Sequence, residues 1–148
     1  MKIKNLKKGF TLIELLIVIA IIGVLATLLM ANFIGVRQRA RDAQRKSDLR
    51  QIQSALEMYR SDNGSYPLTA NFPSCGSAFT YNGNTYMSKV PCDPMSSGTN
   101  LINYTYTSAA GSTYSITACL ENTNDSQATG GSCTINGATG VQFTVNNP

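Results

Sequence analysis

Residues 9–14 read Gly-Phe-Thr-Leu-Ile-Glu, and they open an apolar run that occupies residues 10–36. The run has 27 positions and one ionisable side chain, Glu14. At about 1.5 Å per residue, a helix of this length covers about 40 Å, which exceeds the ~30 Å hydrocarbon core of a bilayer. The sequence therefore predicts a membrane-spanning helix over residues 10–36. A basic leader over residues 1–9 precedes it and carries Lys2, Lys4, Lys7 and Lys8.

A charged side chain at position 14 of this span needs a partner. A carboxylate inside a membrane costs roughly 2.5–3.5 kcal/mol on insertion scales. If the chain were cut after Gly9, Phe10 would carry a free α-amine, which is positive at neutral pH. We expect Glu14 of one chain to neutralise the Phe10 amine of a neighbouring copy.

Small side chains recur every four residues inside the span, at Gly23, Thr27, Ala31 and Gly35. A small-xxx-small pattern lets membrane helices approach each other closely. We therefore predict that these positions, together with Phe10 and Glu14, form the contact between the helices of neighbouring copies.

The segment Lys-Lys-Gly-Phe-Thr-Leu-Ile-Glu at residues 7–14, with the basic leader and the span, resembles the class III signal of type IV pilins and type II secretion pseudopilins. The resemblance covers residues 1–67 closely. It implies a cut between Gly9 and Phe10 by a prepilin peptidase, N-methylation of Phe10, and polymerisation into a helical filament. It also implies an assembly ATPase and an inner-membrane platform protein as partners.

The positive charge is confined to the first part of the chain. Residues 1–60 hold 11 of the 12 Lys and Arg residues against four acids, whereas residues 61–148 hold one Lys against four acids. The basic stretch Arg37–Arg50 lacks interleaved aromatic residues, and we interpret it as a surface for lipid headgroups and the filament core. The chain has no histidine, so the commonest general base is missing, and we predict that the protein is not an enzyme.

The helical pattern continues beyond the span without a break. Leu49, Ile52, Leu56 and Tyr59 recur at three- and four-residue intervals, which predicts an apolar stripe that faces a sheet. We expect small side chains to extend this stripe toward the membrane, namely Ala40, Ala43 and Ser47. The charged residues are expected on the opposite face. Asn63-Gly64 is a typical helix C-cap, so one helix should run from about Phe10 to Asp62.

The rest of the outer domain, predicted over residues 37–148, has the composition of loops and short strands. Residues 68–100 read as a long loop with a minor hairpin around Asn82-Gly83. Alternating apolar and polar residues predict three strands, at 102–107, 113–120 and 141–145. The predicted fold is α+β: a long N-terminal helix packed against a small C-terminal antiparallel sheet of three or four strands.

Four cysteines lie in this outer domain, at Cys75, Cys92, Cys119 and Cys133. An even number in a small exported domain indicates two disulfides, and three pairings exist. Cys75 and Cys92 bracket the long loop, and Cys119 lies on the polar face of its predicted strand. We therefore predict the pairs Cys75–Cys92 and Cys119–Cys133.

Metal binding has little support in the sequence. The cysteine spacings are too wide for a zinc site. The resemblance to pseudopilins implies a calcium loop, of which Asp93 and Asp125 could be a remnant. The carboxylates around them are too sparse for a calcium cage, so we predict no metal site and interpret Asp93, Glu121 and Asp125 as solvated loop acids.

These observations lead to a structural subunit as the predicted function. We interpret the chain as a type IV pilin or pilin-like protein, held as a single-pass precursor in the bacterial inner membrane and assembled into an extracellular or periplasmic filament. The first alternative is the major pseudopilin of a type II secretion system. The second is a surface module for adhesion or DNA uptake, which would make nucleic acid a ligand.

Overall fold

The computed structural model describes residues 9–148, apart from the side chains of residues 31 and 32. The predicted leader, with its lysines at positions 2, 4, 7 and 8, lies outside the described residues except for Gly9. The chain divides into two compact units. One ends at Arg37, and the other, which we call the head, comprises Gln38–Pro148.

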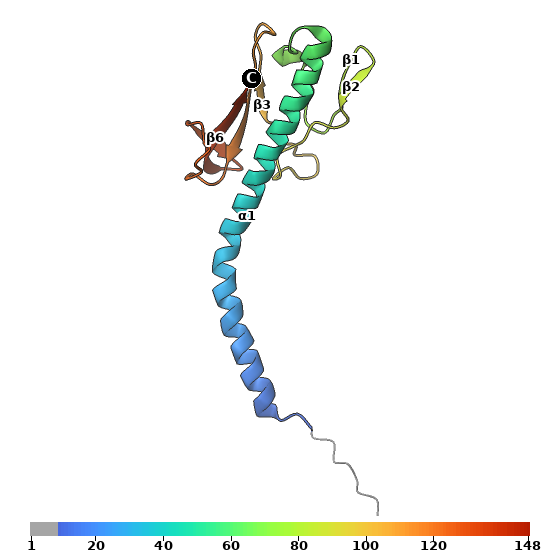
Figure 1. Cartoon of the computed structure of the whole chain (residues 1–148). Coiled ribbons are helices and arrows are strands. Elements are labelled where there is room, and N and C mark those ends of the chain that lie inside the picture. Colours follow the sequence, from blue (N-terminus) through green and yellow to red (C-terminus); the bar gives the residue numbers. More distant parts are fainter. Residues whose placement is uncertain (1–8) are drawn as a thin grey trace, which may run out of the picture. The chain divides into compact units, whose positions relative to one another are not determined.

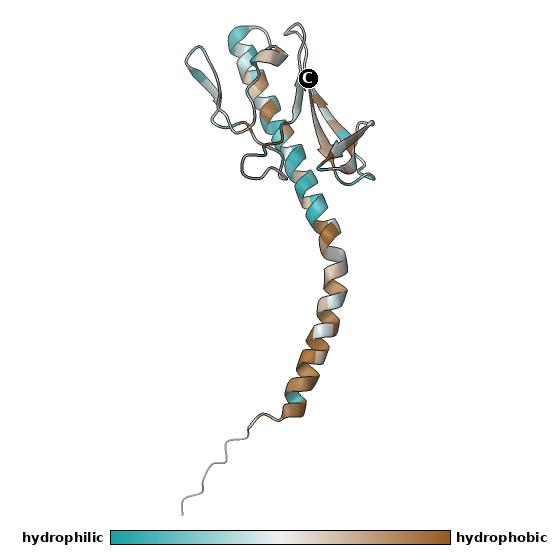
Figure 2. Cartoon of the chain, turned by 180° about the vertical axis from the view of Figure 1, so that it is seen from behind, coloured by the Kyte–Doolittle hydropathy of each residue, from teal (hydrophilic) through white to brown (hydrophobic). Residues whose placement is uncertain are grey.

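A single helix, α1, runs over Leu12–Asn63. The prediction of one long helix is confirmed, and its ends differ from the predicted ones by two residues or fewer. No proline interrupts the sequence between these ends. The helix ends where predicted because Gly64 adopts a left-handed conformation with φ of 76°. Figure 2 shows that α1 changes from apolar to polar along its length.

The head contains a four-stranded antiparallel sheet with the strand order β3-β4-β6-β5. Its strands are β3 (Thr105–Thr107), β4 (Ser115–Leu120), β5 (Ser132–Ile135) and β6 (Ala138–Asn146). The central pair places Ile116 opposite Val145 and Leu120 opposite Val141. The α+β fold with a small C-terminal antiparallel sheet is therefore confirmed.

A second, two-stranded sheet lies within the segment predicted to be a loop. It pairs β1 (Phe79–Tyr81) with β2 (Asn84–Met87) around the turn Asn82-Gly83. Both turn residues have positive φ, as a tight hairpin requires, so the predicted hairpin is confirmed. A short 3-10 helix, η1 (Thr69–Asn71), precedes it.

The core of the head lies between α1 and the two sheets. The stripe Leu49, Ile52 and Leu56 is at most 1% exposed, and it joins Ile116 and Leu120 of β4 in one cluster. The four-stranded sheet lies along one side of this part of α1 and the β1–β2 hairpin along the other (Figure 1). Aromatic rings fill the space toward the hairpin, where Tyr59 stacks on Phe79 with a centroid distance of 5.3 Å.

The small side chains expected to extend the apolar stripe are in fact exposed. Ala40, Ala43 and Ser47 all face away from the core, so this prediction is wrong. The reason is helical geometry: counting back from Leu49 and Ile52 in steps of three and four residues leads to Asp48, Arg45 and Asp42, not to the small residues. These three charged side chains are 0–2% exposed.

The strands also differ from the sequence prediction: β4 begins at Ser115 rather than at residue 113, and β6 is longer than the predicted 141–145. The first strand is confined to Thr105–Thr107, because Ile102 and Asn103 precede the paired segment. The sequence analysis missed β5, which forms the edge of the sheet and pairs only with β6. Its sequence, Ser-Cys-Thr-Ile, has one buried residue, Ile135, so its alternation is too weak to be read as a strand.

Two disulfides join segments of the head. One links Cys75 to Cys92, with 4.9 Å between the Cα atoms, and closes the loop around β1 and β2. The other links Cys119 of β4 to Cys133 of β5, with a Cα–Cα distance of 5.9 Å. The described residues contain no free cysteine.

Candidate functional site

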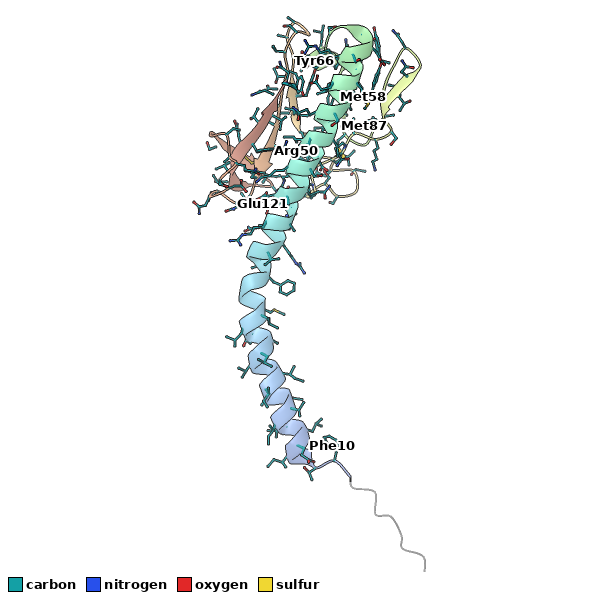
Figure 3. The ribbon with its side chains drawn as sticks, viewed as in Figure 1. Phe10, Arg50, Met58, Tyr66, Met87 and Glu121 are labelled. Atoms are coloured by element: carbon teal, nitrogen blue, oxygen red, sulfur yellow. A yellow bond between two sulfur atoms is a disulfide. The ribbon has the colours of Figure 1, made fainter. Side chains whose placement is uncertain are left out.

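The first turn of α1 carries the residues predicted for processing and assembly. Phe10 is 86% exposed, next to Gly9 at the start of the described chain, and Figure 3 shows it just before the helix. Glu14 lies in the first helical turn. One carboxylate oxygen of Glu14 accepts hydrogen bonds from Thr11 N (2.8 Å) and Thr11 Oγ1 (2.7 Å).

Thr11 and Glu14 form a reciprocal cap. The Thr11 hydroxyl accepts a 3.3 Å hydrogen bond from Glu14 N, and the Glu14 carboxylate reaches back to Thr11 N. This is the capping box of the pattern Ser/Thr-x-x-Glu, which satisfies two backbone donors at a helix start. The sequence analysis missed this second role of Glu14, although the spacing Thr11-Leu-Ile-Glu14 carries the signal. In the isolated chain, the Glu14 carboxylate therefore binds its own helix.

The other residues predicted for assembly are spread along the apolar part of α1. A Cβ added at Gly23 or Gly35 would meet no atom within 4 Å, so both positions present open backbone. Thr27 donates a hydrogen bond to the Val24 carbonyl at 2.7 Å. The side chain of Ala31 lies outside the described part. A contact with neighbouring copies through these residues remains a prediction.

No part of the described chain covers the apolar stretch of α1. Leu12–Met30 is 19 residues long, has a mean hydropathy of 2.9, and is 0% buried. Exposed side chains include Leu12 at 81% and Ile13 at 66%. An apolar surface of this extent requires an apolar environment, which either a bilayer or other helices can supply.

The head holds a second cluster, built around a buried arginine on α1. Arg45 is 0% exposed, and its guanidinium contacts three carboxylates. It donates to Asp93 at 2.7 and 3.0 Å, to Asp42 at 2.7 Å and to Glu121 at 2.8 Å. Arg41 adds a bidentate pair to Glu121, with both distances 2.6 Å. Figure 3 labels Glu121 next to α1.

These contacts correct two expectations. The acids predicted to be solvated are paired: Asp93 binds Arg45, Glu121 binds both Arg41 and Arg45, and Asp125 binds Lys46 at 2.6 Å. In the basic stretch Arg37–Arg50, Arg41, Arg45 and Lys46 are likewise paired inside the head. The other three cations, Arg37, Arg39 and Arg50, are exposed, and for them the interpretation as a lipid surface stays a prediction. The cluster could not be predicted from local sequence because two of the three partners of Arg45, Asp93 and Glu121, lie 48 and 76 residues away along the chain.

The electrostatics of the cluster follow from its pairing. Burial works to lower the pKa of Arg45, but its hydrogen bonds to Asp93, Glu121 and Asp42 hold that pKa above its usual value. The hydrogen bond from Arg41 lowers the pKa of Glu121, and the one from Lys46 lowers that of Asp125. These pKa shifts keep Arg45, Glu121 and Asp125 ionised at neutral pH.

The residues proposed for calcium do not fit that ion. Calcium takes six to eight oxygen ligands, and here both carboxylate oxygens of Asp93 accept hydrogen bonds from Arg45, while Oδ1 of Asp125 accepts one from Lys46. Within residues 9–148, no group of three or more His, Cys, Asp or Glu side chains has an arrangement that could hold a metal ion.

Comparison with known proteins decides between the two families that the N-terminal signal suggests. Residues 4–30 match the prokaryotic N-terminal methylation motif, and residues 32–132 match the model for type II secretion system (T2SS), protein G. The chain belongs to the type II secretion system protein G family. The family is one of structural pseudopilins, which confirms that the chain is not an enzyme.

Relatives within the protein G family cover most of the chain. The type II secretion system core protein G of Escherichia coli is 35% identical over 111 residues, which are 70% of this chain and 77% of that protein. The protein of the same name from Vibrio cholerae is 31% identical over 101 residues, or 64% and 69% of the two chains.

One pilus protein also matches, over a shorter segment. The type IV wide pilus major component of Thermus thermophilus is 52% identical over 59 residues, which are 40% of this chain and 45% of that protein. No solved structure matches significantly. The comparisons therefore favour the alternative interpretation, the pseudopilin, over the type IV pilin that the sequence analysis placed first.

Proposed function

We propose that the chain is the repeating subunit of a type II secretion pseudopilus. The observation that carries the proposal is the exposed apolar half of α1, with its one carboxylate, in a chain of the protein G family. Such a helix suits two successive environments: the inner membrane before assembly, and the interior of a helix bundle afterwards. The head would then lie on the periplasmic side.

In this proposal the precursor is processed at the residues just before the first turn of α1, and only the processed form assembles. A prepilin peptidase cuts between Gly9 and Phe10, and the new Phe10 amine is methylated. Assembly, driven by an ATPase and an inner-membrane platform protein, then brings Glu14 of one copy to the Phe10 amine of another. The match to the N-terminal methylation motif supports this sequence of events.

The head contributes a compact outer surface in this proposal and no catalytic group. The buried pairs of Arg41, Arg45 and Lys46 also weaken the interpretation as a nucleic-acid-binding module, since they leave Arg37, Arg39 and Arg50 as the exposed cations of that stretch. We therefore propose no nucleic-acid ligand.

Deletion of this chain in its source bacterium tests the proposal. We expect exported proteins to accumulate in the periplasm while surface fibres remain, as measured by assaying the culture medium and by electron microscopy. Loss of surface fibres with intact secretion would instead establish the type IV pilus. The 52% identity over 59 residues to the Thermus pilus component is the observation that keeps this second function worth testing.

A further inference from the structure

We propose that the head uses three cations of α1, Arg41, Arg45 and Lys46, in place of a bound divalent cation, so that its fold does not depend on calcium. The proposal concerns the head alone and stands whether or not the chain forms a pseudopilus. It starts from a coincidence in the structure: the two acids that the sequence offers for calcium, Asp93 and Asp125, are paired with adjacent residues of one helix, Arg45 and Lys46.

Arg45 performs the structural task of a multivalent ion, because it joins three separate chain segments. Asp42 lies on α1, Asp93 follows β2 in the loop before β3, and Glu121 directly follows β4. One guanidinium donates to all three, through Nε, Nη1 and Nη2. Its planar fork fits carboxylates in the bidentate geometry seen at Asp93, and it is charged at every pH that the protein meets.

Every carboxylate oxygen of the three acids around Arg45 accepts at least one hydrogen bond. Both oxygens of Glu121 accept from Arg41. Those of Asp42 accept from Arg45 Nη1 and from the backbone N–H groups of Glu121 and Asn122, each at 2.9 Å. Asp93 accepts from Arg45 and from Met95 N. A calcium ion would have to displace these donors and leave a buried guanidinium without partners, which is strongly unfavourable.

The second acid offered for calcium, Asp125, is also paired with a cation of α1. Lys46 Nζ lies 2.6 Å from Asp125, whose carboxylate also accepts a 2.9 Å hydrogen bond from Gln127 N. Asp125 N in turn donates to the Asn122 carbonyl at 3.1 Å. The loop between β4 and β5 is thus ordered by its own turns and by one lysine of α1.

A covalently attached cation differs from a bound one in its dependence on concentration. The stabilisation by a bound ion grows with the logarithm of its free concentration and vanishes when the ion is removed, whereas Arg45 is present in every copy. The head should therefore be equally stable in calcium-depleted and calcium-rich surroundings.

Thermal unfolding of the full-length mature chain in detergent micelles tests this, with the near-ultraviolet circular dichroism of the head's tyrosines as the signal. We expect Tm in 5 mM EGTA and in 5 mM CaCl2 to agree within about 2 °C. A ligand at 100 times its Kd would raise Tm by on the order of 10 °C for a domain of this size. A saturable rise of more than about 2 °C would overturn the proposal.

Variants test whether Arg45 holds the head together. Arg45→Met leaves Asp42 and Asp93 without a cationic partner and leaves Glu121 with Arg41 alone. We expect it to lower Tm by more than 10 °C, with Arg45→Lys falling between it and the wild type. Arg50→Met is the matched control, because Arg50 is exposed on the same helix and has no ion pair among the described residues. Equal Tm values for Arg45→Met and Arg50→Met would overturn the proposal. If Arg45→Met does not fold, Lys46→Met takes its place in the test. We expect Lys46→Met to lower Tm by less than Arg45→Met would, and an unchanged Tm would contradict the proposal.

Discussion

The two parts of α1 handle charge and apolar surface in opposite ways. In the part that ends at Arg37, apolar side chains are exposed, and the one carboxylate, Glu14, forms hydrogen bonds among residues 9–148 only with Thr11 at the start of its own helix. In the head, apolar side chains are buried and the carboxylates facing α1 are neutralised by Arg41, Arg45 and Lys46. The head buries its apolar core and pairs these charges within its own chain. The N-terminal part needs other molecules to cover its apolar surface and to pair with Glu14.

The largest expected effect is the loss of filaments in Glu14→Val. Removal of the carboxylate should leave membrane insertion and cleavage after Gly9 intact, because an apolar residue in a span carries no insertion penalty. The incoming Phe10 amine would lose its partner, and the helices would lose a fixed register. We expect mature protein in the membrane and few or no filaments by electron microscopy and shear fractionation.

Two further variants separate assembly from helix capping at Glu14. Thr11→Val removes the capping hydroxyl but keeps the carboxylate, so filaments should persist. Ile13→Val controls for a neighbouring change on the same exposed turn. If Thr11→Val abolished filaments as completely as Glu14→Val, capping and not pairing between copies would be the essential role.

The next effect concerns the cut that creates the Phe10 amine. A residue without a side chain at position 9 leaves the scissile backbone accessible, so Gly9→Val should accumulate the uncut precursor. Intact-mass measurement distinguishes the two forms by the nine-residue leader. Wild-type subunits that still begin at Met1 would contradict the proposed processing.

A matched pair of leucines tests the contrast in apolar burial. Leu56 is fully buried in the head, whereas Leu28 is 67% exposed in the N-terminal part. We expect Leu56→Ala to lower the free energy of unfolding of the head by about 2–5 kcal/mol, and Leu28→Ala to leave it unchanged. Thermal unfolding in detergent provides the measurement, and similar losses in both variants would erase the difference between the two parts.

The smallest effect is acid sensitivity of the head. The hydrogen bond from Arg41 lowers the pKa of Glu121 from its ordinary value of 4.5, and Lys46 lowers that of Asp125 from 3.8. A carboxyl whose pKa is lowered by folding stabilises the head above its unfolded pKa, and this contribution is lost as pH falls through the folded value. Tm should therefore fall below about pH 4.5, and less steeply in Arg41→Met. Identical acid profiles for the two proteins would contradict this.

The sequence predicted the elements whose signals are local. The length of α1, its stop at Asn63-Gly64 and the hairpin at Asn82-Gly83 all follow from a few adjacent residues. The strand β5 was missed because it has only four residues, of which one, Ile135, is buried. The buried charges at Asp42, Arg45 and Asp48 could not be found, because a charged residue is normally expected at the surface and its partners lie in distant loops.

The bond between Cys119 and Cys133 also bears on how the sheet of the head is held together. Cys119 pairs with Gln142 in the sheet and Cys133 with Gly140, so both cysteines take their places from β6. Gly140 leaves room for this, because a Cβ there would collide with Leu120 O and Cys119 Sγ. In the sheet, β6 lies between β4 and β5, so the sulfur–sulfur bond joins the two neighbours of β6 to each other across that strand. The bond therefore holds β6 between its two partners and keeps the edge strand β5 attached to the rest of the sheet.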